Sequence, residues 1–392
     1  MGVGPHAQLI NEDTYMDPIV RRIDSRMARK LTLLGTAACF LGLVTPRAAS
    51  AQVSPPPPPP PGIELGGLLD GYYDFYSTKP AGDAQLRSFD TKHNQFALSM
   101  AEVWLAKAPT EDSRSGFKVK LSFGPASTNL IHASEPGGAA FQNIQEAYVS
   151  YLAPAGRGVQ VDAGIFVTSV GAEVIEAKDD YNYSRSLLFT LAEPAYHAGV
   201  RATTSPSDKV TLMGGLVNGW NNAVENNTGK TLMGGLTLKP TGVLTLVETY
   251  LVGPETPGTN DGWRHLSDTV LTYTAGPRLS LMANYDYGRD HGVHWQGIAG
   301  YLKYQPTQAI AFSPRFEFYD DASGFTTGTV QKVKELTGTL EVKVDDDLMW
   351  RVEYRADISN ASVFADSAGG AARNHQQSIS FGLLYSFTRK IH

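Results

Sequence analysis

The 392-residue chain contains a single cysteine, Cys39, and no run of 18 consecutive apolar residues. One cysteine excludes a fold stabilised by internal disulfides, because each bridge needs two thiols. The longest apolar run, residues 31–44, is too short for a helix that crosses a bilayer. Basic residues are not in excess either, since the net charge is −6, and this argues against a nucleic-acid partner.

The first 51 residues have the composition of an export signal. A basic stretch ends at Lys30, the apolar run of residues 31–44 follows, and Ala49-Ser50-Ala51 supplies a cleavage site of small residues. We predict a signal peptide over residues 1–51, whose removal takes away six basic and four acidic residues and makes the net charge about −8. Residues 52–62 include seven consecutive prolines and are predicted to form an extended periplasmic linker.

The mature protein is expected to begin at Gln52. Intact-mass measurement of protein isolated from cell envelopes checks this prediction, and residues retained upstream of Ala51 would contradict it. Translation from Met27 instead of Met1 gives the same mature chain. A mass that corresponds to diacylated Cys39 would indicate lipoprotein processing instead.

From residue 63 onwards, apolar and polar residues alternate with a period of two. On residues 350–358, for example, Val352 and Tyr354 alternate with Arg351 and Glu353. This periodicity indicates β-strands whose two faces meet different surroundings. The predicted strands are 63–76, 94–106, 116–124, 143–152, 159–168, 194–204, 210–218, 229–238, 243–252, 267–274, 278–287, 294–304, 309–319, 332–344, 348–358 and 376–388.

The connections between these strands alternate between long and short. Long links, such as residues 77–93 and 169–193, alternate with short ones, such as residues 153–158 and 275–277. Outer-membrane barrels have short periplasmic turns and long outer loops, and lipid tolerates only helices and closed barrels. We therefore predict an all-β, transmembrane antiparallel β-barrel over residues 63–392, located in the cell outer membrane. Sixteen strands fit best, and 14 or 18 remain compatible.

Four segments, in their order and spacing, resemble the OmpL-like β-barrel porins of Gram-negative outer membranes. They are Leu68-Leu69-Asp70-Gly71-Tyr72-Tyr73, Gly164-Ile165-Phe166-Val167-Thr168, Asn182-Tyr183-Ser184-Arg185-Ser186 and Val217-Asn218-Gly219-Trp220-Asn221. The resemblance covers nearly all of residues 63–388 and implies an outer-membrane diffusion channel without specifying its solute. One departure is that Phe387 is not terminal, which leaves the end of the last strand open.

Charged residues on the polar faces of the strands are predicted to line the lumen, because Arg or Lys at the lipid midplane would cost about 2–4 kcal/mol. These residues are Lys118, Lys120, Arg201, Arg315, Glu317, Arg351, Glu353 and Arg355. The long link 169–193 adds Glu173, Glu176 and Arg185. By analogy with general porins, whose third loop folds into the pore, we expect acidic loop residues to face basic wall residues across a constriction. The alternative is that this link only covers the rim.

The expected function is passive diffusion of small hydrophilic solutes and ions. The expected partners are outer-membrane lipid, small polar solutes and the barrel-assembly machinery, and a homo-oligomer is compatible with the sequence. A structural or adhesion barrel, plugged by its own loops, is the alternative. Substitution of the lipid-facing Val352 by Arg is expected to impair folding, whereas Arg351→Ala in the lumen should leave folding nearly intact.

The sequence contains no motif that predicts enzymatic activity or a cofactor. Nucleophile-elbow, Walker and dinucleotide-binding patterns are missing, and an outer-membrane hydrolase would need a Ser/His pair that the sequence does not place. His291 and His294 have H-x-x-H spacing without an apparent third ligand, so no metal site is predicted. The pairs Asp179-Asp180 and Asp320-Asp321 lack the fuller ligand spacing of a dedicated Ca²⁺ loop.

Overall fold

The structure is a computed structural model that describes residues 62–132, 134–367 and 370–391. The predicted signal peptide, and the predicted linker except for Gly62, lie outside the described residues.

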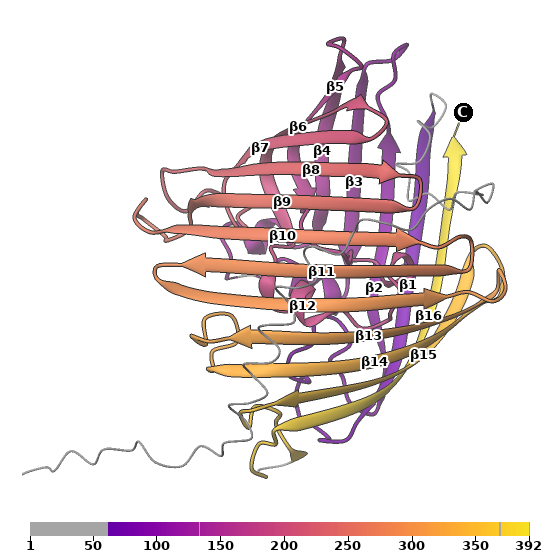
Figure 1. The fold of residues 1–392 in the computed structure, drawn as a ribbon, viewed down its shortest axis with the longest axis vertical. Coiled ribbons are helices and arrows are strands. Elements are labelled where there is room, and N and C mark those ends of the chain that lie inside the picture. The colour runs from indigo at the N-terminus through magenta and orange to yellow at the C-terminus, as the bar shows by residue number, and fades with distance from the viewer. Residues whose placement is uncertain (1–61, 133, 368–369, 392) are drawn as a thin grey trace, which may run out of the picture. The chain divides into compact units, whose positions relative to one another are not determined.

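The strands of the described residues form one closed antiparallel barrel in which each strand pairs with its neighbours in sequence (Figure 1). The strands are β1 (Ile63–Tyr76), β2 (Gln95–Lys107), β3 (Ser115–Phe123), β4 (Ile144–Ala153), β5 (Val159–Val167), β6 (Tyr196–Ser207), β7 (Val210–Val217), β8 (Thr231–Thr241), β9 (Leu244–Pro254), β10 (Trp263–Thr274), β11 (Leu279–Asp290), β12 (Val293–Tyr304), β13 (Ile310–Asp321), β14 (Gln331–Lys343), β15 (Leu348–Ser359) and β16 (His375–Ile391). The predicted number of sixteen strands is confirmed.

Closure of the barrel settles where the last strand ends. β1 pairs with β16 along its whole length, from Ile63 opposite Ile391 to Tyr76 opposite Ser378. β16 therefore continues past the predicted end at residue 388 and past Phe387. The largest difference at a strand start is at β10, which begins at Trp263 instead of residue 267.

The outer faces of β15 and β16 are apolar and exposed, and the inner face of β15 is charged and buried, as the alternation predicts. On β15, Val352 and Tyr354 are exposed on the outer face, whereas Arg351 and Arg355 are fully buried inside. Exposed apolar side chains also follow the outer face of β16, with Phe381 directly opposite Val352. Because one residue of register shift would exchange these faces, the predicted register of β15 is confirmed.

Short helices occur only in the long connections of the described residues. α2 (Pro125–Leu130) and α3 (Gly138–Phe141) lie between β3 and β4, and the 3₁₀-helix η1 (Ala177–Asp179) and π-helical turn η2 (Leu188–Ala192) lie between β5 and β6. None of the described helices is long and apolar enough to cross a membrane.

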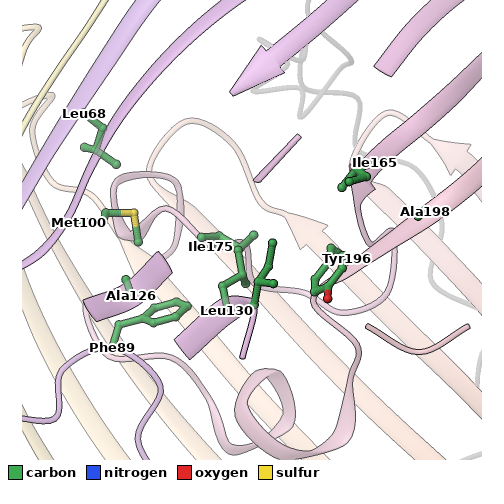
Figure 2. Packing of buried hydrophobic residues seen from close by; sticks show 10 residues of the cluster. Leu68, Phe89, Met100, Ala126, Leu130, Ile165, Ile175, Tyr196 and Ala198 are labelled. Carbon is green, nitrogen blue, oxygen red and sulfur yellow. The ribbon is translucent and has the colours of Figure 1, made fainter. Parts of the chain in front are cut away.

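These long connections bring apolar side chains into the barrel, where they pack against the wall (Figure 2). Leu130 of α2 and Ile175 of the β5–β6 connection belong to one buried cluster with Leu68 of β1, Met100 of β2 and Tyr196 of β6. A barrel of sixteen strands is wide enough for a water-filled lumen. In this protein, loop segments occupy part of that space.

Candidate pore and its inner loop

The connection between β5 and β6, residues 168–195, folds into the lumen and is called the inner loop below (Figure 1). The backbone N–H of Gly171 donates to Asp268 of β10 at 3.0 Å. On the other side of the barrel, the Tyr183 hydroxyl donates to Asp70 of β1 at 2.8 Å. The inner loop therefore contacts distant parts of the wall, and does not only cover the rim.

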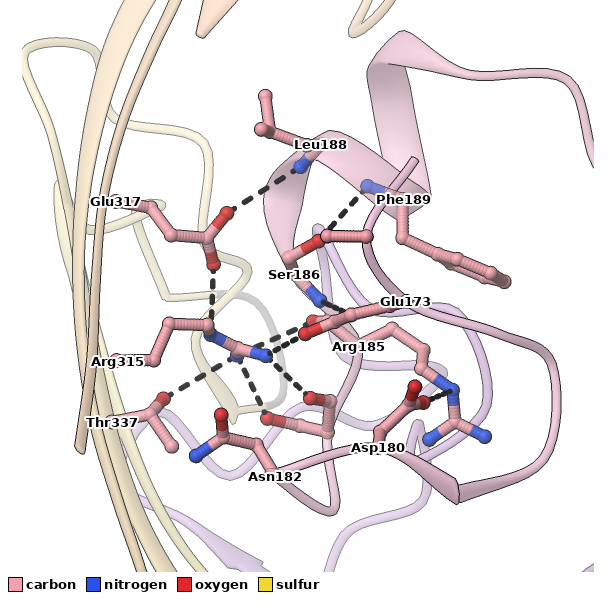
Figure 3. A network of polar contacts seen from close by, with 12 residues as sticks. Glu173, Asp180, Asn182, Arg185, Ser186, Leu188, Phe189, Arg315, Glu317 and Thr337 are labelled. Atoms are coloured by element: carbon pink, nitrogen blue, oxygen red, sulfur yellow. Dashed lines mark hydrogen bonds and ion pairs between the residues drawn. The ribbon is translucent and has the colours of Figure 1, made fainter. Parts of the chain in front are cut away.

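Arg315 of β13 is the central cation of the network that holds the inner loop (Figure 3). Its Nη1 lies 2.8 Å from Glu173 of the loop, and its Nε lies 3.1 Å from Glu317 and 3.2 Å from Glu335. The guanidinium also donates to the backbone carbonyl of Ser184 at 2.8 Å. Arg315 is fully buried, so these partners replace the water that would otherwise solvate it.

Two wall carboxylates accept hydrogen bonds from backbone N–H groups of the loop that have no partner within a helix or a sheet. Glu353 of β15 accepts from the backbone N–H groups of Tyr183 at 2.6 Å and Ser184 at 3.0 Å. Glu317 of β13 accepts from Leu187 N–H at 2.8 Å. Buried amides need such partners, and the inner loop depends on wall side chains to provide them.

Two further arginines of β15 bind loop carbonyl groups. Arg351 donates to the carbonyl of Asp180 at 2.7 Å and to that of Asn182 at 2.9 Å, and its Nε lies 3.0 Å from Glu341. Arg355 donates to the carbonyl of Arg185 at 2.6 Å. Removal of Arg351 would leave these loop carbonyls without their donors, so Arg351→Ala is expected to destabilise the folded protein, contrary to the nearly neutral effect that the sequence suggests.

The Arg185 side chain binds other residues of the inner loop and stabilises its folded shape. Its Nε donates to the carbonyl of Val174 at 3.0 Å and lies 3.3 Å from the Asp180 carboxylate. Its guanidinium also lies over the ring of Phe89, which belongs to the β1–β2 connection. These contacts keep the loop folded where it crosses the lumen.

Lys120 of β3 forms an ion pair with Glu176 of the inner loop. Gln145 of β4 donates to the same carboxylate at 2.7 Å. Burial alone would raise the pKa of Glu176, but the Lys120 charge and these hydrogen bonds outweigh it and lower the pKa to about 2. Because the folded pKa is depressed below 4.5, this anchor is complete above that pH and is lost as the pH falls towards 2.

Lys118 and Arg201 do not take part in holding the loop through charged contacts. Lys118 pairs with Glu146 at 2.5 Å, and Arg201 pairs with Asp162 of β5 at 3.0 Å. The Arg201 guanidinium also lies 4.4 Å from the ring centroid of Phe166. Both side chains retain some exposure inside the barrel.

The arrangement of the predicted site residues differs from the expected one, because loop and wall charges are in direct contact. Of the predicted wall residues, Lys120, Arg315, Glu317, Arg351, Glu353 and Arg355 contact the inner loop directly, and the predicted loop residues Glu173, Glu176 and Arg185 lie among them. Glu173 and Glu176 touch their cationic partners instead of facing them across water. These buried pairs fix the loop to the wall, so they cannot produce an extended transverse field across an aqueous gap.

Space remains between the inner loop and the opposite wall. A cavity of about 900 Å³ reaches from Glu173 and Tyr181 of the loop to Lys209 and Lys239 near the periplasmic turns. A second cavity, of about 460 Å³, is lined by Arg201 and Asp162 among others. The larger one is lined by six threonines from strands β7 to β10: Thr211, Thr237, Thr241, Thr245, Thr272 and Thr274.

Three acidic residues that the fold brings together were not predicted from the sequence. Glu193 of the inner loop, Asp268 of β10 and Asp286 of β11 are buried, with one carboxylate oxygen of each within 4.8 Å of the others. Asp268 and Asp286 lie opposite each other on paired strands, and the path of the inner loop brings Glu193 to them. Arg87 of the β1–β2 connection was missed too, and it pairs with Asp357 of β15 at 3.2 Å.

A closed sixteen-stranded barrel with charged lumen faces, an apolar outer face and an inward-folded loop defines a porin-type outer-membrane protein. The chain belongs to the family described as "Putative beta-barrel porin-2, OmpL-like", whose model matches residues 62–387. No curated protein sequence matches the chain. The predicted family, fold class and outer-membrane location are thereby confirmed.

Solved porins share this fold at low sequence identity. Salmonella typhi OmpF in complex with daunomycin has a TM-score of 0.59 at 13% identity, over 83% of this chain and 98% of that chain. The trimer form of Vibrio cholerae OmpT has a TM-score of 0.55 at 13% identity, over 83% and 99%. An anion-selective porin from Comamonas acidovorans has a TM-score of 0.54 at 12% identity, over 83% and 99%.

Proposed function

We propose that the barrel lets small hydrophilic solutes and ions diffuse passively along the side of the lumen that the inner loop leaves unfilled. The observation that supports this is the cavity of about 900 Å³ between the loop and strands β7 to β11. Its threonine hydroxyls can both donate and accept hydrogen bonds, so they can replace part of the hydration of a polar solute. Passage down a gradient needs no catalytic group.

Planar-bilayer recording of the purified protein tests this proposal. We expect discrete conductance steps for the wild type. Replacement of residues 174–190 by a short Gly-Ser linker should increase the conductance of each step, because the segment that fills the lumen is gone. The barrel should persist, since every strand-to-strand hydrogen bond lies outside the replaced segment. Heat-dependent migration on unheated gels checks that the variant is folded.

A barrel plugged by its own loops is the second candidate function, and one observation favours it. Apolar side chains from β5 to β10 pack with Val170 of the inner loop in a buried cluster that includes Phe166, Val217 and Leu266. Such a cluster excludes water from that part of the lumen. If the wild type gives no conductance and the loop-replaced variant conducts, the protein is a plugged structural barrel and not a diffusion channel. Equal conductance of both proteins would show that the inner loop does not limit the pore.

Ion selectivity is expected to depend on Arg201 and Asp162, which line the smaller cavity as an ion pair. Arg201→Gln should shift the reversal potential towards cation preference, and Asp162→Asn should shift it towards anion preference, because each leaves the other charge uncompensated. Arg278→Gln, at an exposed turn residue, is the matched control and should leave the reversal potential unchanged. Identical reversal potentials for all four proteins would exclude this pair from the ion path.

We further propose that the protein forms a homo-oligomer, supported by the trimer form described for Vibrio cholerae OmpT. Light scattering of the detergent-solubilised protein measures the number of chains per particle. Outer-membrane lipid, small polar solutes and the barrel-assembly machinery remain its predicted partners.

A further inference from the structure

Glu193, Asp268 and Asp286 form a buried acidic cluster at the end of the inner loop, and we call it the carboxylate triad. Glu193 lies just before β6, and Asp268 and Asp286 face each other across the paired strands β10 and β11. The relative exposure of Glu193 is 9%, and that of the two aspartates is 0%. Three ionised carboxylates at this depth repel one another unless a positive charge lies between them.

The protein itself supplies little compensation for the triad. Asp268 accepts hydrogen bonds from Gly171 N–H at 3.0 Å and from the Asn284 side-chain amide at 2.6 Å. Both donors are neutral. No ion pair of the described residues includes a member of the triad.

Asp286 gives a separate indication that a ligand belongs here. Its Oδ1 is 3.4 Å from the Asn284 amide, whereas its Oδ2 is fully buried and has no hydrogen-bond partner among the described residues. Asp286 lies close to both Glu193 and Asp268 within the triad. A buried, unpartnered carboxylate oxygen is costly, and a cation among the three side chains would satisfy it.

We propose that the carboxylate triad binds one Ca²⁺ ion, which joins the end of the inner loop to strands β10 and β11. Carboxylate oxygens are the ligands of hard divalent cations, and Ca²⁺ accepts them at about 2.3–2.6 Å. The three donor atoms lie within 4.8 Å of one another, so one cation can contact all three. Mg²⁺ dehydrates reluctantly and usually keeps several waters, which suits this buried site less well.

Close approach of the backbone at Gly171 helps to form this site. Gly171 has φ +90°, and a Cβ added there would lie 2.0 Å from Glu193 Oε2. Only glycine lets the loop pass this close to the Glu193 carboxylate while its N–H bonds Asp268. The bound ion would fix the Glu193 end of the inner loop to β10 and β11, and the hydrogen bond from Gly171 N–H to Asp268 holds the other end at the same place.

Isothermal titration calorimetry of the folded, full-length protein after EDTA treatment and dialysis tests the site, with CaCl₂ as the probe. We expect one Ca²⁺ per chain and an increase in Tm when CaCl₂ is added. Glu193→Gln and Asp286→Asn should each weaken Ca²⁺ binding by about tenfold or more, since loss of even an outer-shell partner has an effect of that size. Asp346→Asn, at an exposed turn residue, is the matched control and should bind Ca²⁺ like the wild type.

Glu193→Gln lies outside the strands, so it keeps the test valid if Asp286→Asn fails to fold. Unheated gels verify the barrel in each variant. Absence of stoichiometric binding to the wild type, or unchanged binding to folded Glu193→Gln, would overturn the proposal. MgCl₂ binding as tight as that of CaCl₂ would overturn the assignment to Ca²⁺. The titration measures no conductance, so its failure and that of the proposed diffusion function are distinguishable.

Discussion

Arg315→Met is expected to lower the free energy of unfolding by about 3–5 kcal/mol, because it breaks buried ion pairs and leaves their acidic partners uncompensated. Methionine fills much of the same volume without the charge, so Glu173, Glu317 and Glu335 would remain buried around an apolar side chain. The inner loop should detach first, since Glu173 belongs to the loop. Urea unfolding in detergent micelles, followed by tryptophan fluorescence, measures the effect.

Two variants make this experiment specific for the buried pairs. Arg278→Met makes the same chemical change at an exposed turn residue and should stay within about 0.5 kcal/mol of the wild type. Adding Glu173→Gln to Arg315→Met should recover part of the lost stability, because one orphaned charge is removed. If Arg315→Met and Arg278→Met are equally stable, the Arg315 network does not hold the loop.

The barrel itself could be predicted because lipid imposes a rule that every strand must obey. Each strand needs one apolar face, so the alternation around Val352 and Phe381 predicts both the strand and which of its faces meets the lipid. The alternation of long and short connections predicts the antiparallel topology. Strand ends were less certain because turns carry no such rule. β10 starts at Trp263, before its alternation becomes clear.

The arrangement of the candidate site could be predicted only in part. Alternation identified which charged residues face the lumen, and the length of residues 169–193 indicated a special loop. It could not show that Glu176 would touch Lys120 instead of facing it across water. It also could not bring Glu193 to Asp286, since that proximity depends on the path of an irregular loop. Irregular backbone follows no periodicity, and its partners are defined only by the folded barrel.

Val352→Arg is expected to destabilise the barrel by about 2–4 kcal/mol, because it places a charge in the middle of the lipid-facing surface. Val352 lies halfway along β15, exposed on the outer face, between Leu340 of β14 and Phe381 of β16. These neighbours are also apolar and exposed, so the guanidinium would find no partner within this surface. Refolding from urea into lipid vesicles measures the free-energy difference.

Val344→Arg is the matched control, since it makes the same change on an exposed side chain at the β14–β15 turn. A charge at that level can reach water and headgroups, so its cost should be only about 0–1 kcal/mol. The difference between the two variants therefore measures the depth of Val352 and not the general effect of an added arginine. Equal destabilisation by both would mean that β15 does not cross the lipid at Val352, and the outer face described here would not be the membrane surface.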